Sequence, residues 1–408
     1  MSQKLSFLLG SGVSRPAKMP SVIQITEKVL SGNGIMRHTD GNYYFGSPLY
    51  AHAGFPDEYV PRVIAFLKRL SVEIEQYYSF DRDRAITYED LFYVAAQIHD
   101  SEMGEYDNPI VQAFIDKIMP DIKPFLVGHK NETRKQWKLH EIANEATHYI
   151  HDIVWRSLAT EPANLDYLHC VKDVCQDIKL KSVDLFSLNH DIVIEQCFQA
   201  WGVKYTEGFG EPINGVRYWS PELFEGPSIK VRLFKLHGSV NWFLFRANAV
   251  SWRNEPVGIP LNGDFWHTQD PDGQLQTPVD GRPMLLAGTF NKMLQYTSGI
   301  YADLYYQMYR ALRETEILIV CGYGFGDKGI NNRIIEWAYS SDQNVMVVVH
   351  AEPESLKVRA RGAILKNWDN WLQSSKLVLV QKWIEDTSWK DIYGAIQKRT
   401  MNLTHGLD

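Results

Sequence analysis

Glu316-Ile317-Leu318-Ile319-Val320-Cys321-Gly322-Tyr323-Gly324 is the stretch of sequence that decides the fold. An unbroken apolar run that stops at glycines is typical of a strand buried on both faces of a parallel sheet. Five other runs end at a polar or glycine-rich corner in the same way: Leu5–Leu9, Val183–Ser187, Val231–Leu236, Val345–Val349 and Lys376–Val380. Together they predict an α/β fold with a Rossmann-like, doubly wound parallel sheet.

Roughly 170 residues with almost no strand pattern separate the first run from the second, far more than a crossover helix needs. Apolar residues recur at helical spacing in Glu141–Leu158, Val60–Leu70 and Ile110–Ile118. We therefore expect a helical insertion at 41–159. It interrupts a sheet domain made of 1–40 and 160–395, and 396–408 forms a C-terminal tail. The Pro- and Gly-rich segment Trp252–Pro283 predicts a long loop or lid.

Composition and charge limit the class of protein. The 408 residues are 45% apolar and 22% charged, as in globular proteins, and the net charge of −7 disfavours broad attraction to nucleic acid or anionic membranes. Four cysteines are too few for a disulfide framework in so long a chain, and none form a C-x-x-C pair, which argues for a reducing compartment and against a structural zinc module. No secretory segment or membrane-length apolar run is visible, so we expect a cytoplasmic protein.

The first corner, Gly10-Ser11-Gly12-Val13-Ser14, follows the first apolar run. Glycines at this position let the backbone approach a diphosphate closely. Ser21 and Gln24 form a capping box, which predicts a helix from about Val22. Arg15 occupies the last glycine position of the dinucleotide fingerprint G-x-G-x-x-G, so phosphate binding and an ordinary tight turn both remain open.

The second corner, Ser187-Leu188-Asn189-His190-Asp191, and the third, Lys235-Leu236-His237-Gly238-Ser239, also follow strands. Ligands of open α/β sheets bind at such strand ends, which favours a functional role for Asn189 and Asp191. A turn residue and a helix N-cap are the structural alternatives for these two. His237 suits a general base, with a hydrogen-bonded structural histidine as its alternative.

The fourth corner, Gly322-Tyr323-Gly324-Phe325-Gly326-Asp327, contains three alternating glycines, and Asn331 opens the next helix. The glycines indicate either close backbone approach to a ligand or a glycine-rich connector.

Taken in order, the four corners resemble the sirtuin-type NAD-binding domain, and more narrowly the sirtuin-like NAD+ hydrolases of bacterial anti-phage defence. A chain of this length without an appended sensor domain is similar to the members that partner a HerA-type ATPase. The resemblance runs from Leu8 to about Asp386 and is weakest in the helical insertion. It implies an enzyme that releases nicotinamide and ADP-ribose and protects by NAD+ depletion, a form of abortive infection.

The resemblance also implies a role for each matching residue. Asn189 and Asp191 would fix the nicotinamide ribose and the departing ring, and His237 would be the catalytic base. The first corner would line the diphosphate, the fourth would contact or support the adenosine half, and Met284–Lys292 would lie near the pocket. The residues implied to bind NAD+ are Gly10, Ser11, Gly12, Ser14, Ser187, Gly238, Gly322, Phe325, Asp327 and Asn331.

Two departures separate the chain from protein-deacylating sirtuins. Leu188 and His190 replace the Gln and Ile of the Gln-Asn-Ile-Asp motif. The zinc module of those enzymes needs four close ligands. The four cysteines of this chain are spaced wrongly for it: Cys170, Cys175, Cys197 and Cys321. We expect NAD+ as substrate and no zinc or other metal. An NAD-dependent protein deacylase and a non-catalytic NAD or ADP-ribose sensor remain the alternatives.

Partners are implied by the resemblance alone, which points to a homo-oligomer and a HerA-type ATPase. Aromatic residues of the insertion suit either an interface or the core: Tyr43, Tyr44, Phe45, Tyr50, Tyr77, Tyr78, Phe80, Phe92 and Tyr93. A basic stretch suits a solvated helix face better than direct nucleic-acid binding: Lys130, Arg134, Lys135, Trp137 and Lys138.

Overall fold

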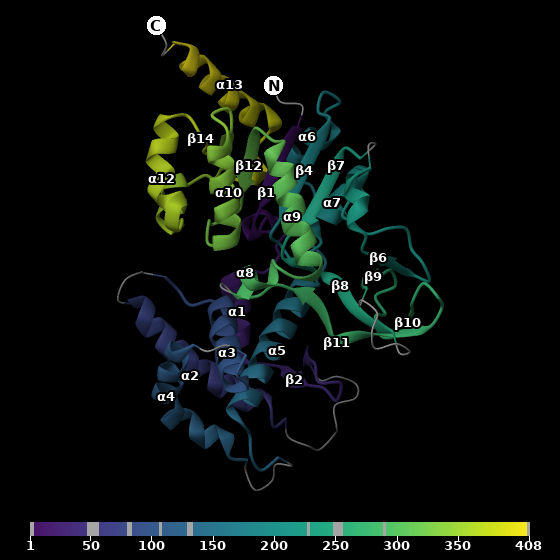
Figure 1. Ribbon diagram of the computed structural model, residues 1–408, viewed down its shortest axis with the longest axis vertical. Coiled ribbons are helices and arrows are strands. Elements are labelled where there is room, and N and C mark those ends of the chain that lie inside the picture. Colours follow the sequence, from purple (N-terminus) through teal and green to yellow (C-terminus); the bar gives the residue numbers. More distant parts are fainter. Residues whose placement is uncertain are drawn as a thin grey trace. The chain divides into compact units, whose positions relative to one another are not determined.

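The computed structural model describes residues 4–46, 57–79, 84–105, 108–128, 134–226, 229–247, 256–288 and 291–405. The chain divides into two compact units (Figure 1). The sheet unit comprises Met1–Met19, Glu161–Val279 and Lys292–Asp408, and the helical unit comprises Pro20–Thr160 and Asp280–Asn291. Within the described ranges, no helix combines the length and apolar character needed to cross a membrane.

A seven-stranded sheet in the order β14-β13-β12-β1-β4-β7-β5 forms the centre of the sheet unit, and its paired strands are parallel. The strands are β1 Lys4–Leu9, β4 Ser182–Ser187, β5 Tyr205–Thr206, β7 Val231–Lys235, β12 Ile317–Cys321, β13 Val345–Val349 and β14 Leu377–Val380. The six predicted strands are confirmed, and the short β5 was not predicted. Every residue of β12 and β13 is buried, as expected for strands covered on both faces, because successive side chains point to opposite sides.

The winding of this sheet reverses at β1. The chain runs from β1 to β4 and β7 on one side, then continues with β12, β13 and β14 on the other. This is the doubly wound order, in which a ligand crevice is expected between the loops of the two strands flanking the reversal, here β1 and β12. Leu9 pairs with both Ser187 and Cys321, and Ser187 pairs with Lys235. All four corners therefore begin at one level of the sheet edge.

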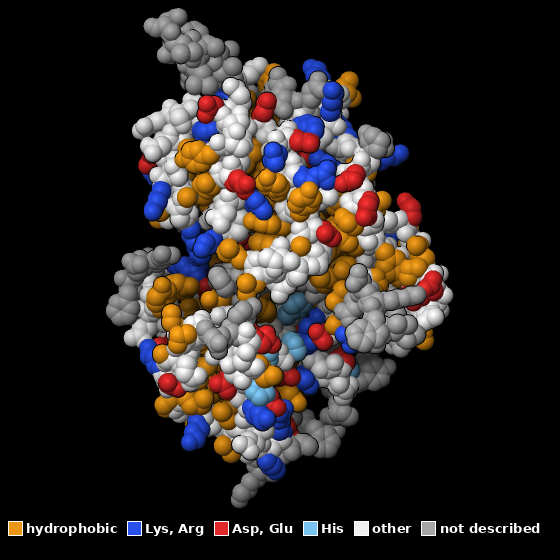
Figure 2. All heavy atoms as spheres, in the orientation of Figure 1, with side chains coloured by type: hydrophobic (Ala, Val, Ile, Leu, Met, Phe, Trp, Pro, Cys, Tyr) orange, Lys and Arg blue, Asp and Glu red, His pale blue; other side chains and the backbone are white. Residues whose placement is uncertain are grey.

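Helices complete the sheet unit: α6 His169–Gln176, α7 Val193–Trp201, α8 Asn291–Gln295, α9 Gly299–Arg313, α10 Lys328–Ser340, α11 Pro353–Arg359, α12 Gly362–Gln373 and α13 Trp389–His405. Helices α9 and α10 lie side by side (Figure 1). Basic and acidic side chains are interspersed with apolar ones over the face that they form (Figure 2). Helix α7 ends at Gly202, which adopts a left-handed conformation there.

The predicted loop or lid at Trp252–Pro283 is wrong over its described part, 256–283. Its strands join an antiparallel sheet of order β10-β11-β8-β9-β6, made of β6 Val216–Tyr218, β8 Gly238–Ala247, β9 Val257–Pro260, β10 Thr268–Gln269 and β11 Leu275–Leu285. Strand β10 pairs with Leu275 and Gln276, so Pro278 and Pro283 further along β11 need not donate a hydrogen bond toward it. Residues 252–255 lie outside the described ranges.

The helical unit contains five helices in its described part: α1 Val22–Ser31, α2 Val60–Ser79, α3 Tyr88–Met103, α4 Pro109–Ile122 and α5 Leu139–Leu158. The capping box of α1 is confirmed, since Ser21 Oγ accepts the Gln24 N–H at 3.3 Å and Gln24 Oε1 accepts the Ser21 N–H at 2.8 Å. A hairpin, β2 Ile35–Arg37 with β3 Tyr43–Phe45, was not predicted. Helix α5 contacts α1, α2, α3 and β3, so its apolar stripe forms the core of this unit.

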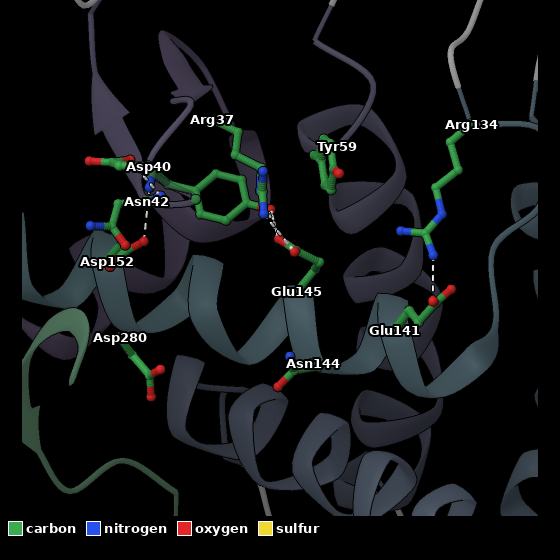
Figure 3. Close-up of polar contacts among 12 residues, drawn as sticks. Arg37, Asp40, Asn42, Tyr59, Arg134, Glu141, Asn144, Glu145, Asp152 and Asp280 are labelled. Atoms are coloured by element: carbon green, nitrogen blue, oxygen red, sulfur yellow. Dashed lines mark hydrogen bonds and ion pairs between the residues drawn. The ribbon is translucent and has the colours of Figure 1, made fainter. Parts of the chain in front are cut away.

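Ion pairs accompany α5 within the helical unit (Figure 3). Arg37 and Glu145 point toward one another and pair at 2.9 Å. The fully buried Asp152 accepts a hydrogen bond from the Tyr43 N–H at 2.8 Å and pairs with Arg282 at 2.9 Å. The charged groups beside α5 are thus held by partners within the unit.

The aromatic and basic residues singled out in the insertion have different surroundings. Tyr43 is fully buried, whereas the side chain of Tyr77 is exposed. Trp137 is buried, and Arg134 pairs with Glu141. Three residues of these two sets lie outside the described ranges: Tyr50, Phe80 and Lys130.

Candidate functional site

The first and fourth corners pack backbone against backbone. The N–H of Gly10 donates to Cys321 O at 2.9 Å, and that of Gly12 donates to Gly322 O at 3.0 Å. A Cβ on Gly10 would lie 2.5 Å from Gly322 O, and one on Gly322, which has φ of +63°, would lie 2.4 Å from the nitrogen of Val13. These glycines are therefore needed for the two loops to meet at the reversal of the sheet.

Asn189 in the second corner has a buried side-chain amide whose nitrogen, but not its oxygen, has a hydrogen-bond partner among the described residues. Its Nδ2 donates to Ser14 Oγ of the first corner at 3.0 Å, and its backbone N–H donates to Ser187 Oγ at 3.2 Å. Its Oδ1 is buried and has no hydrogen-bond partner among the described residues. An unpartnered acceptor in such a place has a free-energy cost of about 1–3 kcal/mol unless a ligand or water supplies a donor.

Asp191 closes the start of α7. Its Oδ1 accepts the Val193 N–H at 3.1 Å, and its carbonyl accepts a hydrogen bond from the ammonium of Lys235. The N-cap of α7 is Ile192, so the N-cap role considered for Asp191 is wrong. The Asp191 carboxylate instead fixes the turn before the helix, beside Asn189.

His237 in the third corner lies in a buried polar cluster. Its Nε2 is 2.7 Å from the Tyr296 hydroxyl and 3.3 Å from Asp327 Oδ2. The Tyr296 hydroxyl is in turn 3.2 Å from the same carboxylate oxygen. Next to His237, Gly238 adopts φ of +80°, which turns the chain from β7 into β8.

Asp327 ends the fourth corner and caps α10. Its Oδ1 accepts the Ile330 N–H at 3.0 Å, which fixes the carboxylate at the start of this helix. Burial opposes ionisation, but the hydrogen bond and charge of His237, the charge of Lys292 and the Ile330 N–H hold the pKa of Asp327 below its usual value. Asp327 is therefore ionised at neutral pH.

The other fourth-corner residues support the loop itself. Asn331 donates to Phe325 O at 2.8 Å and accepts from the Tyr323 hydroxyl at 2.9 Å. Phe325 is fully buried with φ of +52° and packs edge-on against Trp368 at 5.8 Å. In the first corner, by contrast, Ser11 is exposed and Ser14 is buried. The exposed face of these loops is thus formed by few side chains and much backbone.

Lys235, two residues before His237, is a buried charge that the sequence analysis did not assign. Its Nζ pairs with Glu195 Oε1 of α7 at 2.7 Å. Burial raises the pKa of Glu195 to about 7, the charge of Glu207 adds to this rise, and Lys235 opposes it. Glu207 pairs with Arg217 at 2.8 Å. The sequence does carry a sign of this network, since Lys235 is a charged residue within the apolar run Val231–Leu236.

The structure thus brings Asn189 next to Ser14 and His237 next to Asp327, and it adds Tyr296, which no strand end or glycine marks in the sequence. The segment predicted to lie near the pocket is described as far as Gly288, and Thr289 and Phe290 lie outside the described ranges. All four cysteines are buried free thiols. In the described part of the chain, no three histidine, cysteine or acidic side chains converge as a metal site.

Neither a family model nor a curated protein matches the chain. Among solved structures it is similar to a Sir2 homologue in complex with NAD, with a TM-score of 0.37 and 10% identity over 98% of this chain and 91% of that one. It is also similar to a mutant Sir2 homologue in complex with ADP-ribose, with a TM-score of 0.36 and 11% identity over 99% and 94%. Both matches extend over nearly the whole of each chain.

Proposed function

We propose that this chain is an NAD+ hydrolase, an NAD+ nucleosidase that cleaves the bond between nicotinamide and ribose to give nicotinamide and ADP-ribose. The observation that carries the proposal is Asn189 Oδ1, a buried acceptor without a partner among the described residues. It lies at the sheet edge where a doubly wound fold binds its ligand. A ribose hydroxyl of NAD+ would supply the missing donor.

The chemistry of the cleavage matches the groups at this edge. As the bond to nicotinamide breaks, positive charge develops on the anomeric carbon of the ribose, as in other glycosidic cleavages. The departing nicotinamide is neutral and needs no general acid. The site must orient the ribose, take a proton from water and favour positive charge. Asn189, His237 and the ionised Asp327 suit these three tasks.

Sequence departures favour hydrolysis over deacylation. Leu188 and His190 replace two residues of the deacylase motif, and the four buried cysteines do not show the pairing that a sirtuin zinc module needs. The proposal therefore takes water, rather than an acyl-lysine, as the partner of the cleaved ribose.

The sequence resemblance also supports a biological setting: a cytoplasmic effector of anti-phage defence that depletes NAD+, forms a homo-oligomer and works with a HerA-type ATPase. An enzyme that drains NAD+ harms its host if it is always active, so control by assembly is expected. Mass photometry of the purified chain should show assemblies larger than a dimer. A monomer at micromolar concentration would count against the oligomer.

Chromatography of NAD+ incubated with the protein, without any peptide, tests the reaction. His237→Ala should slow nicotinamide release by roughly 10²-fold or more, the usual contribution of a general base. Asn189→Ala should also slow it, because the ribose is then no longer oriented. His267→Ala, whose side chain is 82% exposed in the same unit, is the matched control and should react like the parent. Equal rates for all variants would refute the assignment. NAD+ loss that requires an acyl-lysine peptide would indicate a deacylase, and binding without release would indicate a sensor.

A further inference from the structure

The buried cluster around His237 draws its members from three separate parts of the sheet unit. His237 joins β7 to β8, Tyr296 follows α8, and Asp327 caps α10. Their polar atoms lie within 3.3 Å of one another, and all three residues are largely withdrawn from solvent. The motif comparison linked Asp327 to the adenosine half of NAD+ and gave Tyr296 no role.

The protons in this cluster can be placed from its chemistry. Burial, followed by the charge and hydrogen bond of Asp327, raises the pKa of Tyr296 well above its usual value, so the phenol keeps its single proton. Asp327 is ionised and can only accept. If the phenol donated to His237, its oxygen would face the carboxylate oxygen at 3.2 Å with no proton between them. The phenol therefore donates to Asp327 and accepts a hydrogen bond from Nε2–H of His237.

The packing around Tyr296 holds its hydroxyl in this place. Its ring stacks on that of Tyr305, with centroids 4.6 Å apart and planes 7° apart. The Tyr305 hydroxyl donates to Gly329 O at 2.9 Å. A Cβ on Gly329 would lie 2.8 Å from Cε2 of Tyr296, so the glycine leaves room for the ring. With Asp327 fixed at the start of α10, both partners of His237 are restrained independently.

We propose that Tyr296 and Asp327 are positioning residues that keep the proton of His237 on Nε2, so that Nδ1 is the nitrogen that accepts a proton during NAD+ cleavage. This inference rests on the proposed function. The bond between ribose and nicotinamide breaks, and its electron pair leaves with the nicotinamide. The oxygen of water bonds to the anomeric carbon and its proton passes to Nδ1, which later releases it to solvent. Asp327 stabilises the imidazolium formed in between, as the orienting carboxylate of a catalytic triad does.

Several groups face His237 and enter its pH dependence. Besides Tyr296 and Asp327 they are Lys292, whose charge acts on Asp327, and His190, whose ring centroid is 6.2 Å from that of His237. Neutralising Asp327 removes the negative charge among them, so protonation of His237 becomes less favourable. The acid limb of the rate profile should then move to lower pH.

The first test reads the tautomer directly. Protein with isotopically labelled histidine nitrogens is examined by NMR at pH about 8, where an ordinary histidine is neutral. The signal of His237 is identified by its loss in His237→Ala. We expect a protonated Nε2 and an unprotonated Nδ1. The reverse tautomer would overturn the inference, and this result is obtained whether or not the protein hydrolyses NAD+.

The second test uses nicotinamide release as a function of pH. Tyr296→Phe keeps the stacked ring and should lower kcat about tenfold, the worth of one hydrogen bond. Asp327→Asn keeps an oxygen for the helix cap and should lower kcat by roughly 10–100-fold with little change in KM. The acid limb of its rate profile should lie at lower pH than that of the parent. Tyr306→Phe, which alters an exposed ring of α9, should leave kcat and the pH profile unchanged.

The outcomes separate the two proposals. If the parent protein releases nicotinamide but Tyr296→Phe and Asp327→Asn keep its kcat and pH profile, the positioning role is wrong and the proposed function stands. If the parent releases none, either alone or with a HerA-type ATPase, the proposed function fails, while the tautomer measurement still decides the proton placement. Should a variant unfold, the NMR result on the parent chain still tests the inference.

Discussion

Glu195 should destabilise the folded protein increasingly as pH rises, and replacing it by glutamine should remove this effect. The carboxyl lies behind the second corner, where it pairs with the buried ammonium of Lys235 at 2.7 Å. Burial, with the added charge of Glu207, raises the pKa of Glu195 from 4.5 to about 7. The folded chain therefore holds this proton more tightly than the unfolded chain does.

The size of the effect follows from the two pKa values of Glu195. Below about pH 4.5 the carboxyl is protonated in both states, so the stability difference between parent and Glu195→Gln should not change with pH there. Between 4.5 and about 7 the unfolded chain loses the proton while the folded chain keeps it, and the parent loses stability. At pH about 8 the stability of the variant relative to the parent should be about 3 kcal/mol higher than it is at pH 4.5, since one unit of pKa is worth about 1.4 kcal/mol. Any difference between an amide and a protonated carboxyl beside Lys235 adds only a constant offset.

Urea denaturation at several pH values between about 4.5 and 8 measures this difference. Glu211→Gln, at an exposed position of the same unit, is the matched control and should differ from the parent by a constant amount. Groups that titrate in both proteins cancel in the comparison. A stability difference between parent and Glu195→Gln that does not change with pH would refute this reasoning. A difference that shifts in favour of the parent as pH rises would do the same.

Three further predictions concern the loops and the helical unit. Gly322→Ala should lower stability by about 1–3 kcal/mol and weaken NAD+ binding, because φ of +63° and the 2.4 Å approach to Val13 exclude a Cβ; an unchanged Tm and NAD+ titration would contradict the loop contact. Asp152→Asn should lower the free energy of unfolding by about 3–5 kcal/mol, measured by thermal unfolding, because Arg282 then lacks its buried carboxylate. A loss smaller than that caused by the same substitution at an exposed aspartate would contradict this. ADP-ribose at about a hundred times its Kd should stabilise the parent by about 2.7 kcal/mol, and the same concentration should raise the Tm of Asn189→Ala less; equal shifts would show that Asn189 does not bind the ribose.

The parallel sheet could be predicted because its strands carry their signal locally. Ile317–Val320 is apolar throughout, and burial on both faces permits nothing else. Strand β11 shows the limit of this argument. It contains Pro278 and Pro283 and exposes alternate residues, so its sequence is also typical of a loop. Only the pairing with other strands of its sheet distinguishes the two.

The candidate site divides in the same way. Asn189 and His237 could be singled out because they directly follow strands of an α/β sheet, where ligands bind. Tyr296 carries no such mark, since it lies between two helices and meets His237 through tertiary packing alone. Asp327 was found from its motif, but the bond of its carboxylate to His237 depends on how the fourth corner folds back, which local sequence does not determine.

The central claim is that this chain cleaves NAD+ with water. The most direct measurement is chromatographic quantification of NAD+ and its products after incubation with the purified protein, alone and with a purified HerA-type ATPase as the proposed partner, in the absence of any peptide. The account predicts that nicotinamide appears in step with the loss of NAD+, together with ADP-ribose. Intact NAD+ under both conditions, or cleavage that occurs only when an acyl-lysine peptide is added, would contradict it.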